Sequence, residues 1–240
     1  MENAHYFLHV TDTHLCFDAE APDICCTEQA LRSLYQTAFA WDHRPAFVLI
    51  TGDLVHEGTS ADYARAKTLL QELDEQYHTK TYPALGNHDN RENFNSAFRE
   101  QASDQPVDYC VQNEWLRWIV LDSSCGQVIG QLSASQLAWL EQELCDPTDC
   151  PTILALHHPV YGTTTAETDA NNLATPDRLI RLLQDHPVDG ILCGHSHEAT
   201  LVTEQGLPPQ FVGAGAASAA LPLIQGRVQF RKQCWIQFCR

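Results

Sequence analysis

Residues 46–53 read "AFVLITGD", an apolar and partly β-branched run that ends in a glycine and an aspartate. Such a run predicts a buried strand that leads into a polar loop. The same design occurs upstream in "YFLHVTD" (6–12) and downstream in "TKTYPALGNHD" (79–89). Between these strands, segments that begin near Thr27 and Ser60 carry apolar residues at helical spacing, with these two residues as candidate N-caps. Strands that alternate with helices predict an α/β fold.

The rest of the chain continues this alternation and adds short strands near its end. We expect strands in "WLRWIVLDS" (115–123), "PTILALHHP" (151–159) and "VDGILCGHSH" (188–197), and helices in "SASQLAWLEQELC" (133–145) and "PDRLIRLLQDH" (176–186). After Ala199, turns at "EQGLPPQ" and "IQGR" indicate antiparallel pairs. With no linker or repeat in view, residues 1–240 are expected to form one domain. The long polar stretch 160–176 is a candidate substrate-selecting loop, in which the amides of Asn171 and Asn172 could bind a sugar or phosphate oxygen.

Composition and charge limit the classes of function. The chain has 31 acidic and 14 basic side chains, a formal net charge of -17, and such a surface repels phosphate backbones and so argues against nucleic acid as a partner. No window approaches the ~18 apolar residues that a membrane span needs, and the first residues do not resemble a signal peptide. We therefore expect a soluble, cytoplasmic protein with no membrane partner, and we interpret the ten scattered cysteines as free thiols.

Side chains that can bind a metal follow five of the predicted strands. They are Asp12 and His14 in "DTH", Asp53 in "GD", Asn87 and His88 in "GNHD", His157 and His158 in "HHP", and His195 and His197 in "GHSH". Each motif alone is also compatible with an ordinary turn or a core histidine. Because the carboxyl ends of strands in α/β sheets converge on one crevice, we expect the five motifs to meet. Carboxylate, amide and imidazole groups suit divalent Mn, Fe, Zn or Mg, and their number exceeds the need of a single ion.

In this order the five motifs resemble those of the calcineurin-like metallophosphoesterase superfamily, over positions 12–197. The resemblance implies a four-layer sandwich, in which two mixed β-sheets are flanked by helices, with two divalent ions (Mn, Fe or Zn) at the strand ends. It implies that Asp53 bridges the ions and that His88 is a catalytic residue near the scissile phosphate. The implied ligands are Asp12, His14 and His197 for one ion, and Asn87, His157 and His195 for the other. His157 is preferred over His158 because the family's ligand usually stands two residues before the proline.

Details of the motifs narrow the resemblance. Ser/Thr protein phosphatases carry GDxxDRG, whereas this chain reads "GDLVHEG", and Mre11-like nucleases carry a proline that "EGTSADY" lacks. The stretches "GDLVHEGTSADY", "LSASQLAWLEQEL" and "LALHHP" look most like those of class III cyclic-nucleotide phosphodiesterases and their glycerophosphodiesterase relatives. Those relatives usually continue past the last strands, so a C-terminal segment that shapes the pocket or a homodimer is expected to be missing.

The expected activity is that of a dinuclear-metal phosphodiesterase that hydrolyses a small phosphodiester. The first candidate substrate is a 3',5'-cyclic nucleotide, hydrolysed to the nucleoside 5'-monophosphate. The alternatives are a glycerophosphodiesterase or broad-specificity phosphatase, a metal-dependent nuclease, and a non-catalytic scaffold. A homodimer is one possible assembly. The remaining histidines are interpreted as surface or core residues: His5, His9, His43, His56, His78 and His186.

Overall fold

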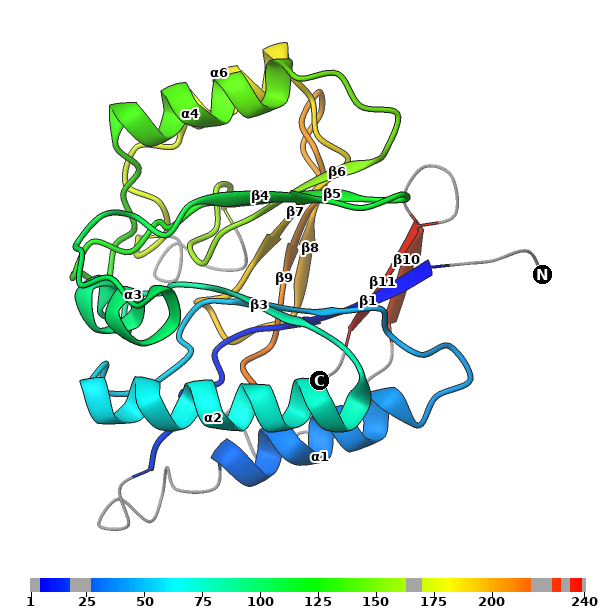
Figure 1. The fold of residues 1–240 in the computed structure, drawn as a ribbon. Helices are drawn as coiled ribbons and strands as arrows, with labels where there is room; N and C mark the ends of the chain where they lie inside the picture. Colours follow the sequence, from blue (N-terminus) through cyan, green and yellow to red (C-terminus); the bar gives the residue numbers. More distant parts are fainter. Residues whose placement is uncertain (1–4, 18–26, 163–169, 217–225, 230–233, 239–240) are drawn as a thin grey trace.

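The computed structural model describes residues 5–17, 27–162, 170–216, 226–229 and 234–238 (Figure 1). Five strands form the first sheet, in the order β10-β11-β1-β2-β3. Their bounds are His5–Val10 (β1), Val48–Thr51 (β2), Thr81–Ala84 (β3), Gly226–Gln229 (β10) and Cys234–Phe238 (β11). Four of them run parallel, and only β10 pairs antiparallel, with β11.

Six strands form the second sheet, in the order β4-β5-β6-β7-β9-β8. Their bounds are Tyr109–Gln112 (β4), Arg117–Val120 (β5), Thr152–Ala155 (β6), Gly190–Cys193 (β7), Thr200–Val202 (β8) and Gln210–Val212 (β9). The four central strands are parallel and both edge strands are antiparallel. The sequence prediction of mixed sheets with antiparallel pairing after Ala199 is therefore confirmed.

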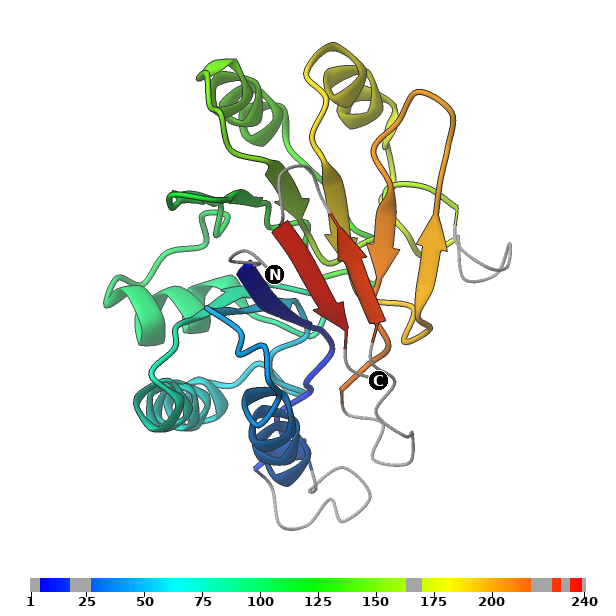
Figure 2. The ribbon, with the colours of Figure 1, turned by 90° about the vertical axis from the view of Figure 1, so that its right-hand side faces the viewer.

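Helices cover the outer face of each sheet, which gives four layers (Figures 1 and 2). Below the first sheet lie α1 and α2, with α3 beside them, and above the second lie α4 and α6. Their bounds are Thr27–Phe39 (α1), Ser60–Tyr77 (α2), Arg91–Arg99 (α3), Ala134–Cys145 (α4) and Asp177–Asp185 (α6). The predicted arrangement of two mixed sheets flanked by helices is thus observed.

Apolar side chains from both sheets fill the space between them. Phe47 stacks on Phe7 at a ring distance of 5.0 Å and on Trp118 at 4.3 Å, so one aromatic column joins the two sheets. Two further clusters of buried residues fasten the helices to the sheets. Because parallel strands are covered on both faces, every residue of β2 and β6 is buried, and most of these residues are apolar.

Two details of the helices differ from the sequence prediction. The N-cap of α2 is Thr59 and not Ser60, because the Thr59 side chain accepts from the backbone N–H of Asp62 while the Asp62 side chain accepts from that of Thr59. The helix α3 and the strand β4 were not predicted from the sequence. Part of the predicted turn at "IQGR" and of the loop over 160–176 lies outside the described residues.

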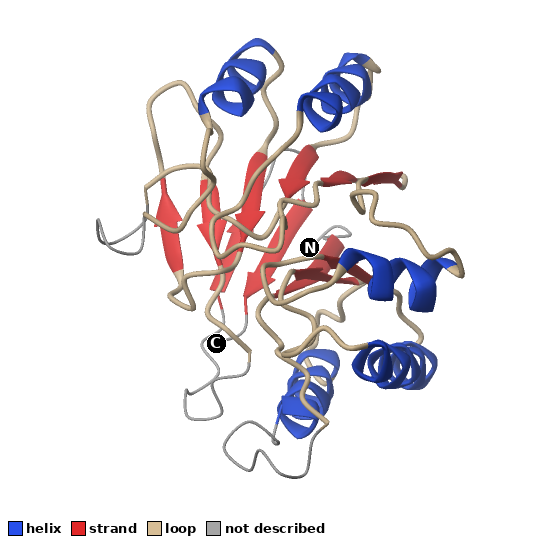
Figure 3. Ribbon diagram, turned by 90° about the vertical axis from the view of Figure 1, so that its left-hand side faces the viewer, coloured by secondary structure: helices blue, strands red, loops and turns tan. Residues whose placement is uncertain are grey.

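The central strands of the two sheets end on the same side of the molecule, which Figure 3 faces. Backbone hydrogen bonds join the segments that follow them. Asp12 donates its N–H to the carbonyl of Gly52 (3.1 Å), and Gly194 donates to the carbonyl of His157 (2.9 Å). The five polar motifs therefore share one edge, as the sequence predicts for strand ends in α/β sheets.

Candidate metal centre

One group of metal-binding side chains comes from the first sheet and from the loop after β7. It comprises Asp12, His14, Asp53 and His197, whose candidate ligand atoms all lie within 4.8 Å of one another. Nε2 of His197 lies 3.1 Å from Oδ1 of Asp12 and 3.3 Å from Nε2 of His14. Asp12 is held in turn by the hydroxyl of Thr11 and by the backbone N–H of His195.

A second group lies on the other side of Asp53. Nε2 of His157 is 3.1 Å from Oδ1 of Asn87, and Nδ1 of His195 is 2.9 Å from the same oxygen and 3.2 Å from Nε2 of His157. The other nitrogen of His157 donates to the carbonyl of Thr51, and the ring of His195 bonds to the backbone of Asn171. These bonds leave Nε2 of His157 and Nδ1 of His195 as the nitrogens that face Oδ1 of Asn87. Burial alone would lower the pKa of His157, but the nearby carboxylates of Asp53 and Asp12 raise it above its ordinary value.

A cation fits this convergence of acceptors. Lone pairs that meet without a proton between them repel one another, and a divalent ion between them turns that repulsion into coordination. Asp53 stands where two ions could share it, since its Oδ2 lies 3.5 Å from Nε2 of His14 and 3.4 Å from Nε2 of His157. The donor set therefore fits divalent metal ions, with oxygen and imidazole ligands and no thiolate.

The backbone of the candidate ligands is strained. Seven described non-glycine residues have a positive φ, and five of them carry candidate ligand side chains: Asp12, His14, Asp53, His195 and His197. The other two, His78 and Glu100, end helices, where this conformation is common. Non-glycine residues in the left-handed region cluster at functional sites because the surrounding structure must enforce them.

Glycines allow the motif loops to approach one another closely. A Cβ on Gly86 would lie 2.2 Å from Oδ1 of Asp53, and one on Gly52, which has a φ of 90°, would lie 2.4 Å from Nδ1 of His157. The glycines of "GNHD" and "GD" are therefore needed for packing against the candidate ligands, besides any role in a turn.

Asp89, the last residue of "GNHD", connects two of the motif loops. Its carboxylate accepts from the backbone N–H groups of Gly86 (2.9 Å), Leu54 (3.1 Å) and Val55 (3.4 Å) and from the hydroxyl of Tyr63 (2.9 Å). Burial, and next the nearby charge of Asp53, raise the pKa of Asp89 to about 7. The resemblance implies that Asp89 orients a neighbouring residue, and its contacts show that it supports the two loops.

Burial and charge set the protonation of the imidazoles. Burial lowers the pKa of His14 and of His195 to about 4, so both rings are neutral at pH 7 and can offer a lone pair. Burial alone would raise the pKa of Asp12, but its hydrogen bond with His197 and the nearby imidazoles bring it below the ordinary value. The same hydrogen bond raises the pKa of His197.

The structure distinguishes His157 from its neighbour His158. Nδ1 of His158 lies 2.8 Å from the hydroxyl of Ser123, and its Nε2 lies 3.0 Å from the carbonyl of Val128. Both ring nitrogens of His158 are thus occupied by protein groups, and burial lowers its pKa to about 2. His158 packs against His195 at a ring distance of 4.6 Å and so supports the second group from behind.

His88 lies at the exposed rim of the site, beside the first group. Its backbone N–H donates to Oδ1 of Asp53 (2.9 Å), and Nδ1 of its ring lies 3.0 Å from the carbonyl of His56. Its ring is perpendicular to that of His14, at 4.7 Å. His14, His56 and His88 form a third group whose nitrogens lie within 4.8 Å of one another. From the sequence, His56 was interpreted as an ordinary histidine, although it stands where Mre11-like nucleases carry the histidine of GDLFH.

The loop over 160–176 meets the site at its described ends. The backbone of Asn171 bonds to the ring of His195, while the side chain of Asn172 is buried and donates to the carbonyl of Tyr161 (3.5 Å). Residues 163–169, to which part of the predicted substrate-selecting loop belongs, lie outside the described residues. The contact with His195 is a backbone contact, which no residue type in the sequence could have indicated.

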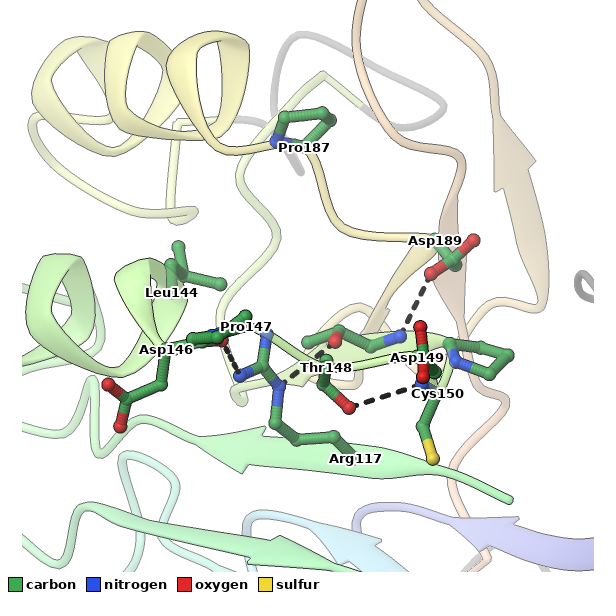
Figure 4. A pocket seen from close by; sticks show the side chains of 11 residues that line it. Arg117, Leu144, Asp146, Pro147, Thr148, Asp149, Cys150, Pro187 and Asp189 are labelled. Atoms are coloured by element: carbon green, nitrogen blue, oxygen red, sulfur yellow. Dashed lines mark hydrogen bonds between the residues drawn. The ribbon is translucent and has the colours of Figure 1, made fainter. Parts of the chain in front are cut away.

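A separate pocket lies at the other ends of the strands, near the starts of β5 and β6 (Figure 4). Its buried Arg117 donates to the hydroxyl of Thr152 (3.0 Å) and to the carbonyls of Glu143 (3.1 Å) and Asp146 (2.9 Å). Arginine donors satisfy unpaired carbonyls at a helix C-terminus, so Arg117 fastens the end of α4 to the second sheet. This pocket contains none of the candidate ligands.

Comparison with known proteins agrees with this geometry. Residues 5–199 match the family described as Calcineurin-like phosphoesterase, and this range includes all five motifs. The chain belongs to the calcineurin-like phosphoesterase family.

The relatives of the chain include several bacterial phosphodiesterases. The chain is 36% identical to a probable cyclic nucleotide phosphodiesterase of Rhodococcus erythropolis, over 85% of this chain and 68% of that protein. It is 32% identical to a cAMP/cGMP dual specificity phosphodiesterase of Mycobacterium tuberculosis, over 95% and 72% of the two chains. A glycerophosphodiester phosphodiesterase of Enterobacter lignolyticus is 33% identical to the chain, over 66% of this chain and 58% of that protein. With the family, these relatives confirm the prediction of a metal-dependent phosphoric diester hydrolase.

Solved structures share the fold at low sequence identity. A dimetal phosphatase from Danio rerio superposes with a TM-score of 0.70 at 16% identity, over 90% of this chain and 89% of that one. A purple acid phosphatase from yellow lupin superposes with a TM-score of 0.63 at 14% identity, over 92% of this chain and 45% of that one. The predicted calcineurin-like sandwich is therefore confirmed.

Within the described residues, no helix has the length and apolar character needed to cross a membrane.

Proposed function

We propose that this protein is a dinuclear-metal phosphodiesterase whose substrate is a small phosphodiester, above all a 3',5'-cyclic nucleotide that it hydrolyses to the nucleoside 5'-monophosphate. The observation that carries the proposal is the position of Asp53, whose Oδ2 is about equally far from an imidazole of each ligand group. A carboxylate shared by two ions is the arrangement that two-metal hydrolysis at phosphorus uses.

Seven side chains are assigned as ligands. They are Asp12, His14 and His197 for one ion, Asn87, His157 and His195 for the other, and Asp53 for both. When bound, divalent ions acidify water and neutralise charge on phosphoryl oxygens. The protein's own contribution is to fix the ligands in place, through Thr51 behind His157 and the Thr11 hydroxyl behind Asp12.

His88 is assigned as the catalytic residue. Its Nδ1 donates to the carbonyl of His56, which leaves Nε2 as the nitrogen that can carry a second proton and meet the substrate. His88 is exposed while its backbone is tied to Asp53, so its ring can reach a phosphodiester without binding a metal. In this position a protonated His88 donates to the leaving alkoxide or stabilises its charge.

The relatives favour a cyclic nucleotide as the substrate. Two of the phosphodiesterases to which the chain is 32–36% identical are named for cyclic nucleotides, and together they align with most of this chain. A glycerophosphodiester is the second candidate, because relatives named for it align at 32–33% identity. The predictions of a cytoplasmic location and of a homodimer stay predictions.

The test combines metal analysis with a panel of substrates. The purified protein should contain two divalent ions per chain and hydrolyse bis(p-nitrophenyl) phosphate and cyclic AMP or cyclic GMP, with glycerophosphodiesters and single-stranded DNA as comparison substrates. Asp53→Ala is the inactive control. Asp104→Ala is the matched control, because it makes the same substitution at an exposed aspartate that is not a candidate ligand. A protein that binds two ions and hydrolyses none of these diesters would contradict the proposal.

A further inference from the structure

His88 is held on three sides, and His56 provides two of the contacts. The carbonyl of His56 accepts from Nδ1 of His88 at 3.0 Å. The rings of His56 and His88 stack, with centroids 5.2 Å apart and planes at 26°. The ring of His14 closes the third side with its perpendicular contact at 4.7 Å. An exposed imidazole would otherwise sample several rotamers, and these contacts restrict it to one.

His56 is itself anchored and does not rest on His88 alone. Its backbone N–H donates to the carbonyl of Leu15 at 3.1 Å, next to the bridge that pairs Leu15 with Val55. Its ring also meets that of His14 at 5.5 Å, and the side chain is 26% exposed. A ring fixed in this way can orient a neighbour.

The nitrogens of His56 contribute little to these contacts. Nδ1 is buried and has no hydrogen-bond partner among the described residues, and Nε2 lies 3.5 Å from the carboxylate of Glu57, whose side chain is 70% exposed. An ion pair that is so exposed is worth little. The face of the ring, not its ability to bind protons or metal, is therefore the feature that meets His88.

We infer that His56 is a positioning residue, whose ring fixes the imidazole of His88 so that Nε2 faces the leaving group of the bound diester. The inference rests on the proposed catalytic role of His88 and adds to it the residue that orients the proton donor. Misplacing a catalytic group by about 1 Å can lower the rate by two orders of magnitude, so loss of one stacking partner should be visible in turnover.

The competing interpretation is that His56 is a metal ligand, since its nitrogens lie close to those of His14 and His88. The two roles predict opposite results for His56→Phe. A phenylalanine keeps the stacking face, removes an unpartnered buried nitrogen, and cannot bind a metal. The positioning role requires this variant to keep its metal and its activity, whereas the ligand role requires it to lose both.

The experiment measures metal content, kcat and KM for His56→Ala, His56→Phe, His88→Ala and the double variant His56→Ala/His88→Ala. His43→Ala is the matched control, because His43 is another half-buried histidine stacked on a ring, that of Tyr6, at the start of β1. The substrates are cyclic AMP, which has a poor alkoxide leaving group, and bis(p-nitrophenyl) phosphate, which has a good one.

We expect His56→Ala to keep its ions and to lose kcat for cyclic AMP by roughly tenfold, with a smaller loss for the p-nitrophenyl diester. His56→Phe should stay within about threefold of the wild type, and the double variant should be no slower than His88→Ala alone, because two residues that act through one group are not additive.

Three results would overturn the inference: unchanged kcat in His56→Ala, loss of metal in His56→Phe, or losses that multiply in the double variant. A different result contradicts the proposed function: His88→Ala that is as active as the wild type on both substrates removes the role of His88 itself. The two failures are distinguishable because the second is read from His88→Ala alone.

Discussion

Tyr63 supports the candidate metal centre from the helix α2, and its removal can be predicted in detail. Its hydroxyl donates to Oδ1 of Asp89 (2.9 Å) and accepts from the backbone N–H of Asn90 (2.7 Å). The ring is fully buried, so Tyr63→Phe deletes two hydrogen bonds and leaves the packing almost unchanged. Asp89 keeps its three backbone donors, which hold the loops after β2 and β3 together.

The expected cost follows from these two bonds. A neutral hydrogen bond contributes about 0.5–1.5 kcal/mol and one to a charged group about 1.5–3 kcal/mol, so Tyr63→Phe should lower the free energy of unfolding by about 2–4 kcal/mol. The carboxylate must be ionised for the larger value, and the pKa of Asp89 is raised to about 7 by burial and the charge of Asp53, so pH 8 is the suitable condition. For a chain of this size, 1 kcal/mol corresponds to roughly 2–4 °C in Tm.

The assay is urea denaturation at pH 8 with a chelator present, because bound metal would add its own stabilisation. Tyr161→Phe is the matched control, since Tyr161 is also buried but its hydroxyl has no hydrogen-bond partner among the described residues. That variant should be neutral or slightly stabilised, because it removes an unsatisfied polar group. Equal changes in Tyr63→Phe and Tyr161→Phe would refute the reasoning from hydrogen bonds.

Further predictions concern the metals, the catalyst and the loop. Asp53→Ala should lose both ions and His197→Ala mainly one; elemental analysis that finds two ions in Asp53→Ala would rule out the bridge. Asn87→Ala should lower metal content, whereas His88→Ala should keep its ions and lose turnover by a factor on the order of 10² to 10⁴, less for p-nitrophenyl esters. An equal loss on good and poor leaving groups would favour electrostatic stabilisation over proton donation. Replacing residues 163–169 by a few Gly and Ser residues should leave metal content and hydrolysis of a small artificial diester intact but raise KM or lower kcat for the natural diester; equal kinetics for both substrates would exclude the loop from the mechanism.

Strong local patterns explain which elements the sequence predicts. The strands that meet the site combine an apolar run with a polar end, and both properties are visible in single residues. α3 was missed because it has only nine residues, and its apolar face consists of just Phe94, Ala97 and Phe98, which is too short a pattern to stand out in the sequence. β4 is a half-buried edge strand of four residues, too short for a clear alternation. The N-cap of α2 could have been found, since Thr59 and Asp62 have the spacing of a capping box.

The candidate metal centre likewise has parts that the sequence indicates and parts that it does not. Side-chain types at strand ends indicate which residues can be ligands, but the groups that orient these ligands are mostly backbone atoms. The carbonyl of Thr51 fixes the tautomer of His157, and the carbonyl of His56 fixes that of His88. Every residue has a carbonyl, so no pattern of residue types distinguishes the ones that matter. The stacking of His56 on His88 likewise depends on the pairing of two loops that are 32 residues apart.

The strained backbone and the converging acceptors act on stability in the same direction. Each non-glycine residue in the left-handed region costs about 1–2 kcal/mol, and five candidate ligands adopt it. When the facing nitrogens carry no proton, the lone pairs of His157, His195 and Asn87 also meet unfavourably. The buried strands and the carboxylate of Asp89 offset both costs, since Asp89 accepts backbone hydrogen bonds from the loops after β2 and β3 and holds the two loops together. Loops held in this way keep the candidate ligands at the separation that the proposed sharing of Asp53 requires, so less of the binding energy of the ions is spent on ordering the loops.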